Sequence, residues 1–422
     1  MEYKYRFLQE KLASPPEHFG SVLITGPRRA GKTTLAKHLL KLWGGDPERS
    51  YYSFDTPDEI AKFQRDPELF FQSLELPVIF DEIQNIPDLI PYVKSALDKR
   101  PKGSCQFILT GSQQFQLMNK VTESLAGRVL IKELFPFSSA EISGIDSGLF
   151  RKNWLQLLTK NMFSFKSTPV KKNEVFDSLL RGGFPPIQNI QNSEDRRDWF
   201  QSYLQTYIQR DIRELGNVSD LGQFHRFISL LSGRSSHILN YSELGKDIGV
   251  NYKTTQRWTS LLESTYLWKN LSPFSSNSES RISKRPKGIM MDSGLLCYLT
   301  GIYSEDSLEN TPLIGHIFES FVISELLKTF SFLNLPIQCF HFRSSTKKEV
   351  DFIADLGNEI IPFEIKFTSS ISDKHGDGIK AFMKHLPNKN IRKGYVISLH
   401  PEFAEIQKNI FSLPLGTLIN MK

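Results

Sequence analysis

The sequence predicts an α/β fold: a parallel sheet, then a helical middle, a helix-turn-helix with a possible wing and a C-terminal α/β domain. Three observations predict it. Short apolar runs alternate with helical stretches from Ser21 to about Glu133. Helical spacing with little strand signal fills about 140–232, and three further strand candidates follow Phe318. Alternating strands and helices form βαβ units, whose strands pair in parallel.

The composition predicts a folded, soluble protein. The chain has 422 residues, 39% of them hydrophobic, and a net charge of +6. That length suggests two to four domains at roughly 100–200 residues each, and the mild basic bias permits a nucleic-acid partner without requiring one. No apolar run approaches the ~18 residues of a membrane span, and the charged N-terminus is unlike a signal peptide. Three cysteines without CxxC spacing predict neither zinc nor disulfides, so we expect a cytoplasmic protein.

Five runs rich in β-branched and aromatic residues predict buried strands in the N-terminal part. They are SVLIT (21–25), YYSFD (51–55), LPVIFDE (76–82), CQFILTG (105–111) and RVLIKEL (128–134). Helical spacing marks TTLAKHLLKLW (33–43) and LIPYVKSALDK (89–99).

The segment GPRRAGKT, residues 26–33, matches the phosphate-loop pattern G-x-x-x-x-G-K-[ST] between a strand and a helix. Gly26 and Gly31 allow the backbone to curl until its N–H groups point at phosphate oxygens, and the helix adds its positive N-terminal end. We expect Lys32 to reach the β- and γ-phosphates and the Thr33 hydroxyl to bind Mg²⁺. The predicted ATP-binding residues are Gly26, Pro27, Arg28, Arg29, Ala30, Gly31, Lys32, Thr33 and Thr34.

An apolar strand that ends in two carboxylates follows at 77–82. Such a strand alone is weak evidence, but together with the phosphate loop it indicates nucleotide hydrolysis. Asp81 is expected to hold Mg²⁺, and Glu82 is expected to orient and polarise the attacking water.

Two more positions are candidates for catalysis. The strand in FILTGSQQF should lie beside the acidic strand, so Ser112 and Gln113, with Thr110 third, are candidates to sense the γ-phosphate. The alternative is a strand-to-loop turn without ligand contact. Arg128 is either an arginine finger for a neighbouring subunit's nucleotide or a surface arginine in a salt bridge.

Several short motifs in order resemble a family of prokaryotic ATPases within the AAA+ superfamily. They are GPRRAGKTTL, FDEIQ, LTGSQQF, SLAGRV, ELFPFSSAEI, RGGFPP, YLQTYIQRDI, MDSGLLCYLTG and KEVDFI…FEIK. Members pair an N-terminal ATPase with a C-terminal domain of uncharacterised function. The resemblance implies an AAA+-type core, ATP hydrolysis and assembly into a homo-oligomer.

The segment 241–262 has the spacing of a helix-turn-helix, with Gly249 in the turn. Its second helix offers side chains able to meet DNA phosphates or base edges, namely Lys253, Thr254, Gln256 and Arg257. In the family, this module looks like a winged helix, and the basic loop Arg281–Lys287 is a candidate wing or phosphate contact. The alternatives are a module that packs on protein partners and a solvated loop.

Carboxylates and a lysine on two C-terminal strands form a third constellation. Alternation places Glu364 and Lys366 on one face, where Asp351 of the preceding strand can join them and Glu319 of the preceding helix can complete the site. Such a set can bind Mg²⁺ and activate water, and it resembles the PD-(D/E)xK nuclease fold. The alternatives are surface ion pairs or a related but catalytically idle fold.

The predicted domains are an ATPase domain (1–138), a helical middle (139–232), a winged helix-turn-helix (233–290) and a nuclease-like domain (291–422). The leading functional hypothesis is an AAA+-type ATPase that binds and hydrolyses ATP and acts on or with DNA. The alternatives are an ATP-gated, metal-dependent DNA endonuclease and a regulatory, protein-binding ATPase with an idle C-terminal domain.

Overall fold

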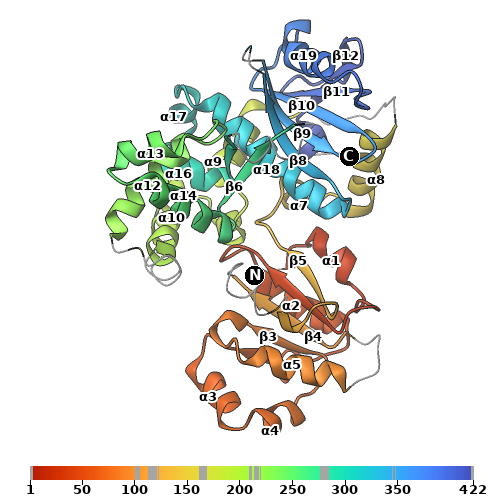
Figure 1. The fold of residues 1–422 in the computed structure, drawn as a ribbon, viewed down its shortest axis with the longest axis vertical. Coiled ribbons are helices and arrows are strands. Elements are labelled where there is room, and N and C mark those ends of the chain that lie inside the picture. The colour runs from red at the N-terminus through yellow and green to blue at the C-terminus, as the bar shows by residue number, and fades with distance from the viewer. Residues whose placement is uncertain are drawn as a thin grey trace. The chain divides into compact units, whose positions relative to one another are not determined.

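The computed structural model describes residues 3–99, 105–112, 121, 123–160, 169–208, 212, 218, 220–275, 285–344, 346 and 348–419. The chain forms two compact units. The N-terminal unit comprises Met1–Pro136 with Ser264–Tyr266, and the C-terminal unit comprises Phe137–Glu263 and Leu267–Lys422. Both are α/β, which confirms the predicted fold class (Figure 1). The finer division into four domains stays a prediction.

The N-terminal unit contains a five-stranded sheet in the order β2-β3-β4-β1-β5, with parallel pairing throughout (Figure 1). Its strands are β1 (Ser21–Thr25), β2 (Tyr51–Ser53), β3 (Val78–Asp81), β4 (Phe107–Gly111) and β5 (Val129–Glu133). β4 pairs with the acidic strand β3, as predicted. The prediction that all five strands are buried was wrong for β2 and β5, which are only partly buried because they form the two edges of the sheet.

Alternating strand residues build a core on each face of this sheet. Val22 and Ile24 pack in one cluster with Leu35 of the helix after β1, whereas Leu23 packs with Phe80 in the other. The helices are α1 (Phe7–Leu12), α2 (Lys32–Leu42), α3 (Pro57–Arg65), α4 (Pro67–Gln72), the 3₁₀ helix η1 (Ile83–Asn85) and α5 (Leu89–Asp98). Apolar packing on both faces therefore holds the sheet in place. This packing sets the positions of the carboxyl ends of its strands.

The first part of the C-terminal unit is helical where the structure describes it, as the sequence predicted. Its helices are α7 (Ser139–Ile142), α8 (Ser147–Thr159), α9 (Lys172–Arg181), η2 (Pro185–Asn189), α10 (Ser193–Tyr207), α12 (Leu221–Gly233), α13 (Tyr241–Ile248) and α14 (Tyr252–Ser264). Gly249, with φ of 79°, caps α13 in the left-handed region that glycine favours. The expected pair of helices around Gly249 is therefore present.

An eight-stranded mixed sheet dominates the rest of this unit, in the order β12-β13-β11-β10-β9-β8-β6-β7. Its strands are β6 (Trp268–Pro273), β7 (Lys287–Met290), β8 (Gln338–Arg343), β9 (Glu349–Asp355), β10 (Ile360–Lys366), β11 (Gly394–Ser398), β12 (Ala404–Gln407) and β13 (Ile410–Pro414). The strands expected in EVDFIAD, IIPFEIK and GYVISL are β9, β10 and β11. The remaining helices are α16 (Ser293–Leu299), α17 (Glu305–Glu309), α18 (Ile314–Leu333), η4 (Asp373–Gly376), α19 (Asp377–His385) and α20 (Gly416–Ile419).

The hairpin after α14 joins the same sheet as β9 and β10. β6 pairs with β7 on one side and, through Ser272 and Pro273, with β8 on the other. The long helix α18 is buried along most of its length and contacts both β7 and β10. β7, α18 and β9 can therefore send side chains into one region.

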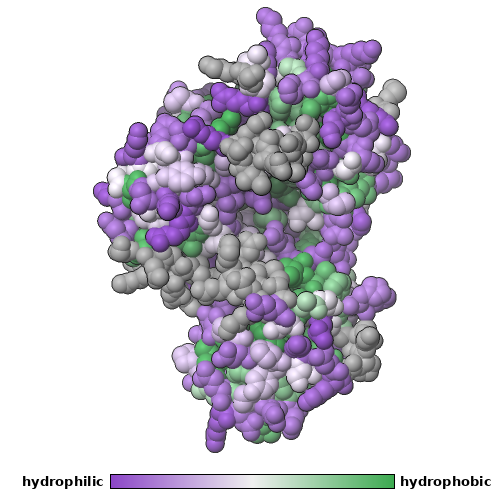
Figure 2. Space-filling view, viewed as in Figure 1, coloured by the Kyte–Doolittle hydropathy of each residue, from purple (hydrophilic) through white to green (hydrophobic). Residues whose placement is uncertain are grey.

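The surface is mainly hydrophilic on the face in Figure 2, where apolar residues are scattered among polar ones. Among the described residues, the exposed large apolar side chains are those of Tyr5, Leu42, Leu69, Leu149, Tyr252 and Tyr303. Within the part of the chain that the structure describes, no helix has both the length and the apolar character needed to cross a membrane.

Candidate functional site

The predicted phosphate loop connects β1 to α2 and depends on two glycines. Gly26 has φ of 145°, and a Cβ there would lie 2.1 Å from the Leu134 carbonyl oxygen, so only glycine allows this close approach. Gly31 has φ of 94° and precedes the first residue of α2. The loop therefore curls as the motif predicts, directly before a helix N-terminus.

Arg6 fixes the loop through two hydrogen bonds to backbone carbonyl groups. Its Nη1 donates to the carbonyl oxygen of Ala30 at 2.8 Å, and its Nη2 donates to that of Phe135 at 2.6 Å. The side chain is buried, so these bonds to a charged donor form away from water and are stronger than exposed ones. No sequence signal marked Arg6, because it lies far along the chain from Phe135.

The Lys32 ammonium lies over the loop's own backbone. Its Nζ donates to the carbonyl oxygens of Gly26 and Pro27, at 3.0 Å each, and the residue is buried. Of the other loop residues, Arg28 is partly buried, while Arg29 and Thr34 are exposed. The predicted residues thus surround one helix N-terminus, where anions are favoured.

Asp81, at the carboxyl end of β3, is the centre of a hydroxyl cluster. Its carboxylate accepts hydrogen bonds from Thr33 Oγ1 at 3.0 and 3.1 Å, from Tyr51 OH at 2.8 Å and from Thr110 Oγ1. Burial and the nearby Asp81 carboxylate raise the pKa of Tyr51 to about 12, so this phenol keeps its proton and donates. The structure brings Thr33 and Asp81 together as predicted, and adds Tyr51, which the sequence did not suggest.

Glu82 is held by a second set of contacts. Its backbone N–H donates to Thr110 Oγ1 at 3.2 Å, and its carboxylate accepts from Gln84 Nε2 and from Ser112 Oγ, the latter at 3.4 Å. Gln84 also donates to Ser112 Oγ, at 3.2 Å. Ser112 therefore contacts the expected water-orienting residue, whereas Gln113 lies outside the described residues. Gln84 was missed, although it sits in the quoted motif FDEIQ.

The residues around Thr33 and Asp81 fit a magnesium ion bound together with a nucleotide. A hydroxyl and a carboxylate lie within 3.1 Å of each other at the carboxyl edge of the sheet. Mg²⁺ favours such oxygen donors and typically takes one or two carboxylates plus substrate phosphates. In open α/β sheets, this edge is also where ligands bind.

Arg128 forms an exposed ion pair with Asp98. Its Nε lies 2.8 Å from Asp98 Oδ1, and the two side chains are 38% and 46% exposed. This contact matches the alternative of a surface salt bridge, and such pairs contribute little to stability. An arginine-finger role for Arg128 stays a prediction.

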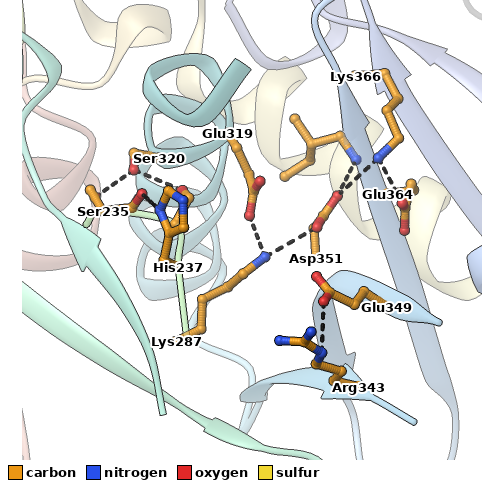
Figure 3. Close-up of polar contacts among 12 residues, drawn as sticks. Ser235, His237, Lys287, Glu319, Ser320, Arg343, Glu349, Asp351, Glu364 and Lys366 are labelled. Carbon is orange, nitrogen blue, oxygen red and sulfur yellow. Dashed lines mark hydrogen bonds and ion pairs between the residues drawn. The ribbon is translucent and has the colours of Figure 1, made fainter. Parts of the chain in front are cut away.

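The C-terminal constellation is assembled, but with an extra member. Lys366 Nζ lies 2.8 Å from Glu364 and 3.8 Å from Asp351, as the strand alternation predicted. Lys287 Nζ lies 3.1 Å from Asp351 Oδ1 and also pairs with Glu319 (Figure 3). We call these five residues the carboxylate cluster.

Two features of the carboxylate cluster conflict with the predicted Mg²⁺ site. The first is Lys287, which was expected in a basic loop as a phosphate contact but is a buried residue of β7. The second is the ligand set, because the carboxylates already pair with lysines. Among the described residues, no group of three or more His, Cys, Asp or Glu side chains is placed to hold a metal. In this arrangement, the residues of the carboxylate cluster do not fit Mg²⁺.

The second helix of the helix-turn-helix presents polar side chains to solvent. Lys253, Gln256 and Arg257 of α14 are exposed, and Thr254 is partly buried. On the preceding helix, Glu243 and Asp247 are both engaged by Arg234, at 3.3 and 3.4 Å. Of the basic loop Arg281–Lys287, residues 281–284 lie outside the described residues.

Three stretches of the chain match family models. Residues 18–143 match a model described as an AAA domain. Residues 172–306 and 314–418 match models described as Domain of unknown function (DUF8612) and Domain of unknown function (DUF4143). The first match agrees with the resemblance of the N-terminal unit to AAA+ P-loop ATPases and covers the site at Thr33 and Asp81.

Relatives and solved structures add further likenesses. Uncharacterized protein Rv2008c of Mycobacterium tuberculosis and Uncharacterized protein Mb2031c of Mycobacterium bovis are each 29% identical over 351 residues, which is 83% of this chain and 71% of theirs. The Thermotoga maritima RuvB Holliday junction branch migration motor is 16% identical, over 66% of this chain and 94% of that one, with a TM-score of 0.32. The Aeropyrum pernix Orc1 protein in complex with DNA is 13% identical, over 67% and 86%, with a TM-score of 0.28. At such TM-scores, neither structure supports a particular function for this chain.

Proposed function

We propose that the N-terminal unit binds ATP with Mg²⁺ and hydrolyses it. The contact that carries this proposal is the one between the Thr33 hydroxyl and the Asp81 carboxylate, at 3.0 and 3.1 Å, beside the first turn of α2. A threonine that directly follows the loop lysine and an acid at the end of β3 are the two protein ligands that a P-loop ATPase provides for Mg²⁺.

Each residue has a defined task in the proposed reaction. The loop N–H groups and the start of α2 bind the phosphate oxygens, and the Lys32 ammonium exchanges the carbonyls of Gly26 and Pro27 for the β- and γ-phosphates. Bound Mg²⁺ neutralises charge on the β- and γ-oxygens. Glu82 orients the attacking water, while Gln84 and Ser112 fix the Glu82 carboxylate.

The purified full-length chain tests this proposal directly. We expect calorimetry to show uptake of one ATP per chain in the presence of Mg²⁺, and a phosphate-release assay to show turnover that stops when EDTA removes the ion. Turnover must need Mg²⁺ because the Thr33 hydroxyl and the Asp81 carboxylate carry no positive charge that could neutralise the triphosphate. Clean, folded protein that takes up no ATP would contradict the proposal.

We further propose that DNA is the object on which the ATPase acts. The supporting observation is the charge balance of the helix-turn-helix: Arg234 engages both acids of α13, Glu243 and Asp247, and α14 exposes Lys253 and Arg257. Residues four apart lie on one face of a helix, so the two cations can meet one strand of phosphates. Affinity of this kind comes mainly from the release of counterions.

Changing Lys253 and Arg257 to alanine tests the DNA proposal. We expect the double variant to bind duplex DNA more weakly for all sequences, with a salt slope that is lower by about 0.9 for each phosphate that is no longer neutralised. Fluorescence anisotropy at several salt concentrations measures this slope, and DNA should stimulate ATP turnover of the wild type. Lys380→Ala is the control, because Lys380 is an exposed lysine of α19 in the same unit.

One outcome would redirect this proposal. Absence of salt-dependent binding and of stimulation would favour the regulatory, protein-binding ATPase.

The proposal also includes a homo-oligomer. In it, Arg128 of one subunit would leave Asp98 and reach the nucleotide of the next subunit. The ATP-gated endonuclease gains no support from the carboxylate cluster in the arrangement found.

A further inference from the structure

We propose that Lys287 is the built-in cation of the carboxylate cluster, and that the cluster is an ionic lock rather than a metal site. Lys287 reaches from β7 between Glu319 of α18 and Asp351 of β9 and pairs with both (Figure 3). This is the position between the helix carboxylate and the strand carboxylate that a divalent ion would need. The inference concerns the C-terminal unit and does not depend on the proposed ATPase.

Both oxygens of Asp351 are already engaged. Oδ1 accepts from Lys287 Nζ at 3.1 Å, and Oδ2 accepts from the backbone N–H of Ile365 at 2.9 Å and lies 3.8 Å from Lys366 Nζ. Lys287 and Lys366 hold the pKa of Asp351 below its usual value against the effect of burial. A metal ion would have to displace Lys287 to reach this carboxylate.

Lys287 is held in place by its backbone. Gly288 donates to the His237 carbonyl oxygen at 3.0 Å and accepts from the Ser236 N–H at 2.7 Å. A Cβ on Gly288 would lie 2.1 Å from Trp268 Cζ2, so the strand is packed tightly there. Because a rigid strand carries it, Lys287 enters the cluster in a fixed direction rather than from a mobile loop.

Hydroxyl groups beside the ion pairs join α18 to a further segment, residues 235–236. The Ser320 hydroxyl of α18, next to Glu319, lies 2.6 Å from that of Ser235 and 2.9 Å from that of Ser236 (Figure 3). Residues 235–239 lead directly into the helix-turn-helix. The lock therefore connects the start of the helix-turn-helix and β7 with α18 and β9.

Charge balance predicts what happens without Lys287. The three carboxylates of Glu319, Asp351 and Glu364 face two ammonium groups, those of Lys287 and Lys366. Removing one ammonium leaves three buried acids around a single lysine, and a buried carboxylate without a partner destabilises the folded state. A divalent ion can then replace the missing charge, so Lys287→Met should convert the lock into a metal site.

The experiment compares Mn²⁺ binding to full-length variants without nucleotide, all carrying Asp81→Asn so that the N-terminal unit lacks the carboxylate proposed to bind Mg²⁺. We expect electron paramagnetic resonance to show no tight Mn²⁺ site with Lys287 present, and Lys287→Met to bind Mn²⁺ about tenfold more tightly or better, a difference of about 1.4 kcal/mol. Millimolar Mn²⁺ should also raise the melting temperature of Lys287→Met, because a ligand of the folded state stabilises it. Hydrogen exchange should speed up at 235–239 and β7 and slow again when Mn²⁺ is added.

Lys328→Met is the matched control. Lys328 is also buried, and its ammonium pairs with Glu325 at 2.8 Å on the same helix, α18. We expect this variant to lose stability without any rescue by Mn²⁺. Rescue of both variants would show a nonspecific effect and overturn the inference, as would a folded Lys287→Met variant that binds no Mn²⁺.

If Lys287→Met does not fold, Mn²⁺ binding to the protein that keeps Lys287 still decides the question. Tight Mn²⁺ binding in the presence of Lys287 that disappears in Asp351→Asn would show a functional metal site and overturn the inference. Continued absence of binding in both proteins supports the lock. Neither result bears on ATP uptake, so failure here is distinguishable from failure of the proposed ATPase.

Discussion

Glu82→Gln should keep ATP binding and lose turnover by about a hundred- to ten-thousandfold, the range typical of removing a general base. Glutamine has the same shape and can still accept a hydrogen bond from Gln84 or Ser112, so the local structure should persist. It lacks the negative charge that polarises the attacking water. Single-turnover phosphate release measures the chemical step, and calorimetry measures ATP affinity.

The control for this prediction is Glu75→Gln, which makes the same change at an exposed carboxylate of the same unit. It should leave both binding and turnover unchanged. Turnover of Glu82→Gln close to that of the wild type would assign the water-orienting role to another group. Loss of ATP binding in Glu82→Gln would instead indicate that the carboxylate shapes the loop.

The phosphate loop could be predicted from the sequence because its determinants are local. Gly26, Gly31 and Lys32 act through the backbone turn in which they lie, so a contiguous pattern carries the whole geometry. Asp81 could also be predicted, because it lies at the end of an apolar strand that closes with two acids. The partners that fix these residues were not local: Tyr51 reaches Asp81, and Arg6 reaches Phe135, only because the sheet brings distant segments together.

The C-terminal unit shows the same limit more strongly. Strand alternation predicted that Glu364, Lys366 and Asp351 would converge, and they do. Lys287 lies 64 positions from Asp351 and 32 from Glu319, in a stretch interpreted as a basic loop. Only the pairing of β6 with β8, which extends the sheet to β7, places Lys287 beside them. A motif indicates which ligands are present, whereas the topology decides what else enters the site.

Lys32→Ala should strongly lower ATP turnover and weaken ATP binding. The ammonium is the one loop side chain expected to contact the β- and γ-phosphates, and removing one preorganised donor of this kind lowers turnover by about a hundred- to a thousandfold. Charge-assisted hydrogen bonds contribute about 1.5–3 kcal/mol, so the affinity should fall by roughly ten- to a hundredfold. Calorimetry and phosphate release on the full-length chain measure both effects.

The structure offers a control that separates chemistry from folding. Lys41, in the last turn of the same helix, is exposed, so Lys41→Ala removes the same charge from α2 without touching the loop and should behave as the wild type. Lys32 is buried and donates to Gly26 and Pro27, so the melting temperature of Lys32→Ala must be compared too. If that variant melts as the wild type does and still turns over ATP at the wild-type rate, the triphosphate does not bind at this loop. The roles of Thr33, Asp81 and Glu82 would then fall together, because each is defined by where Lys32 places the γ-phosphate.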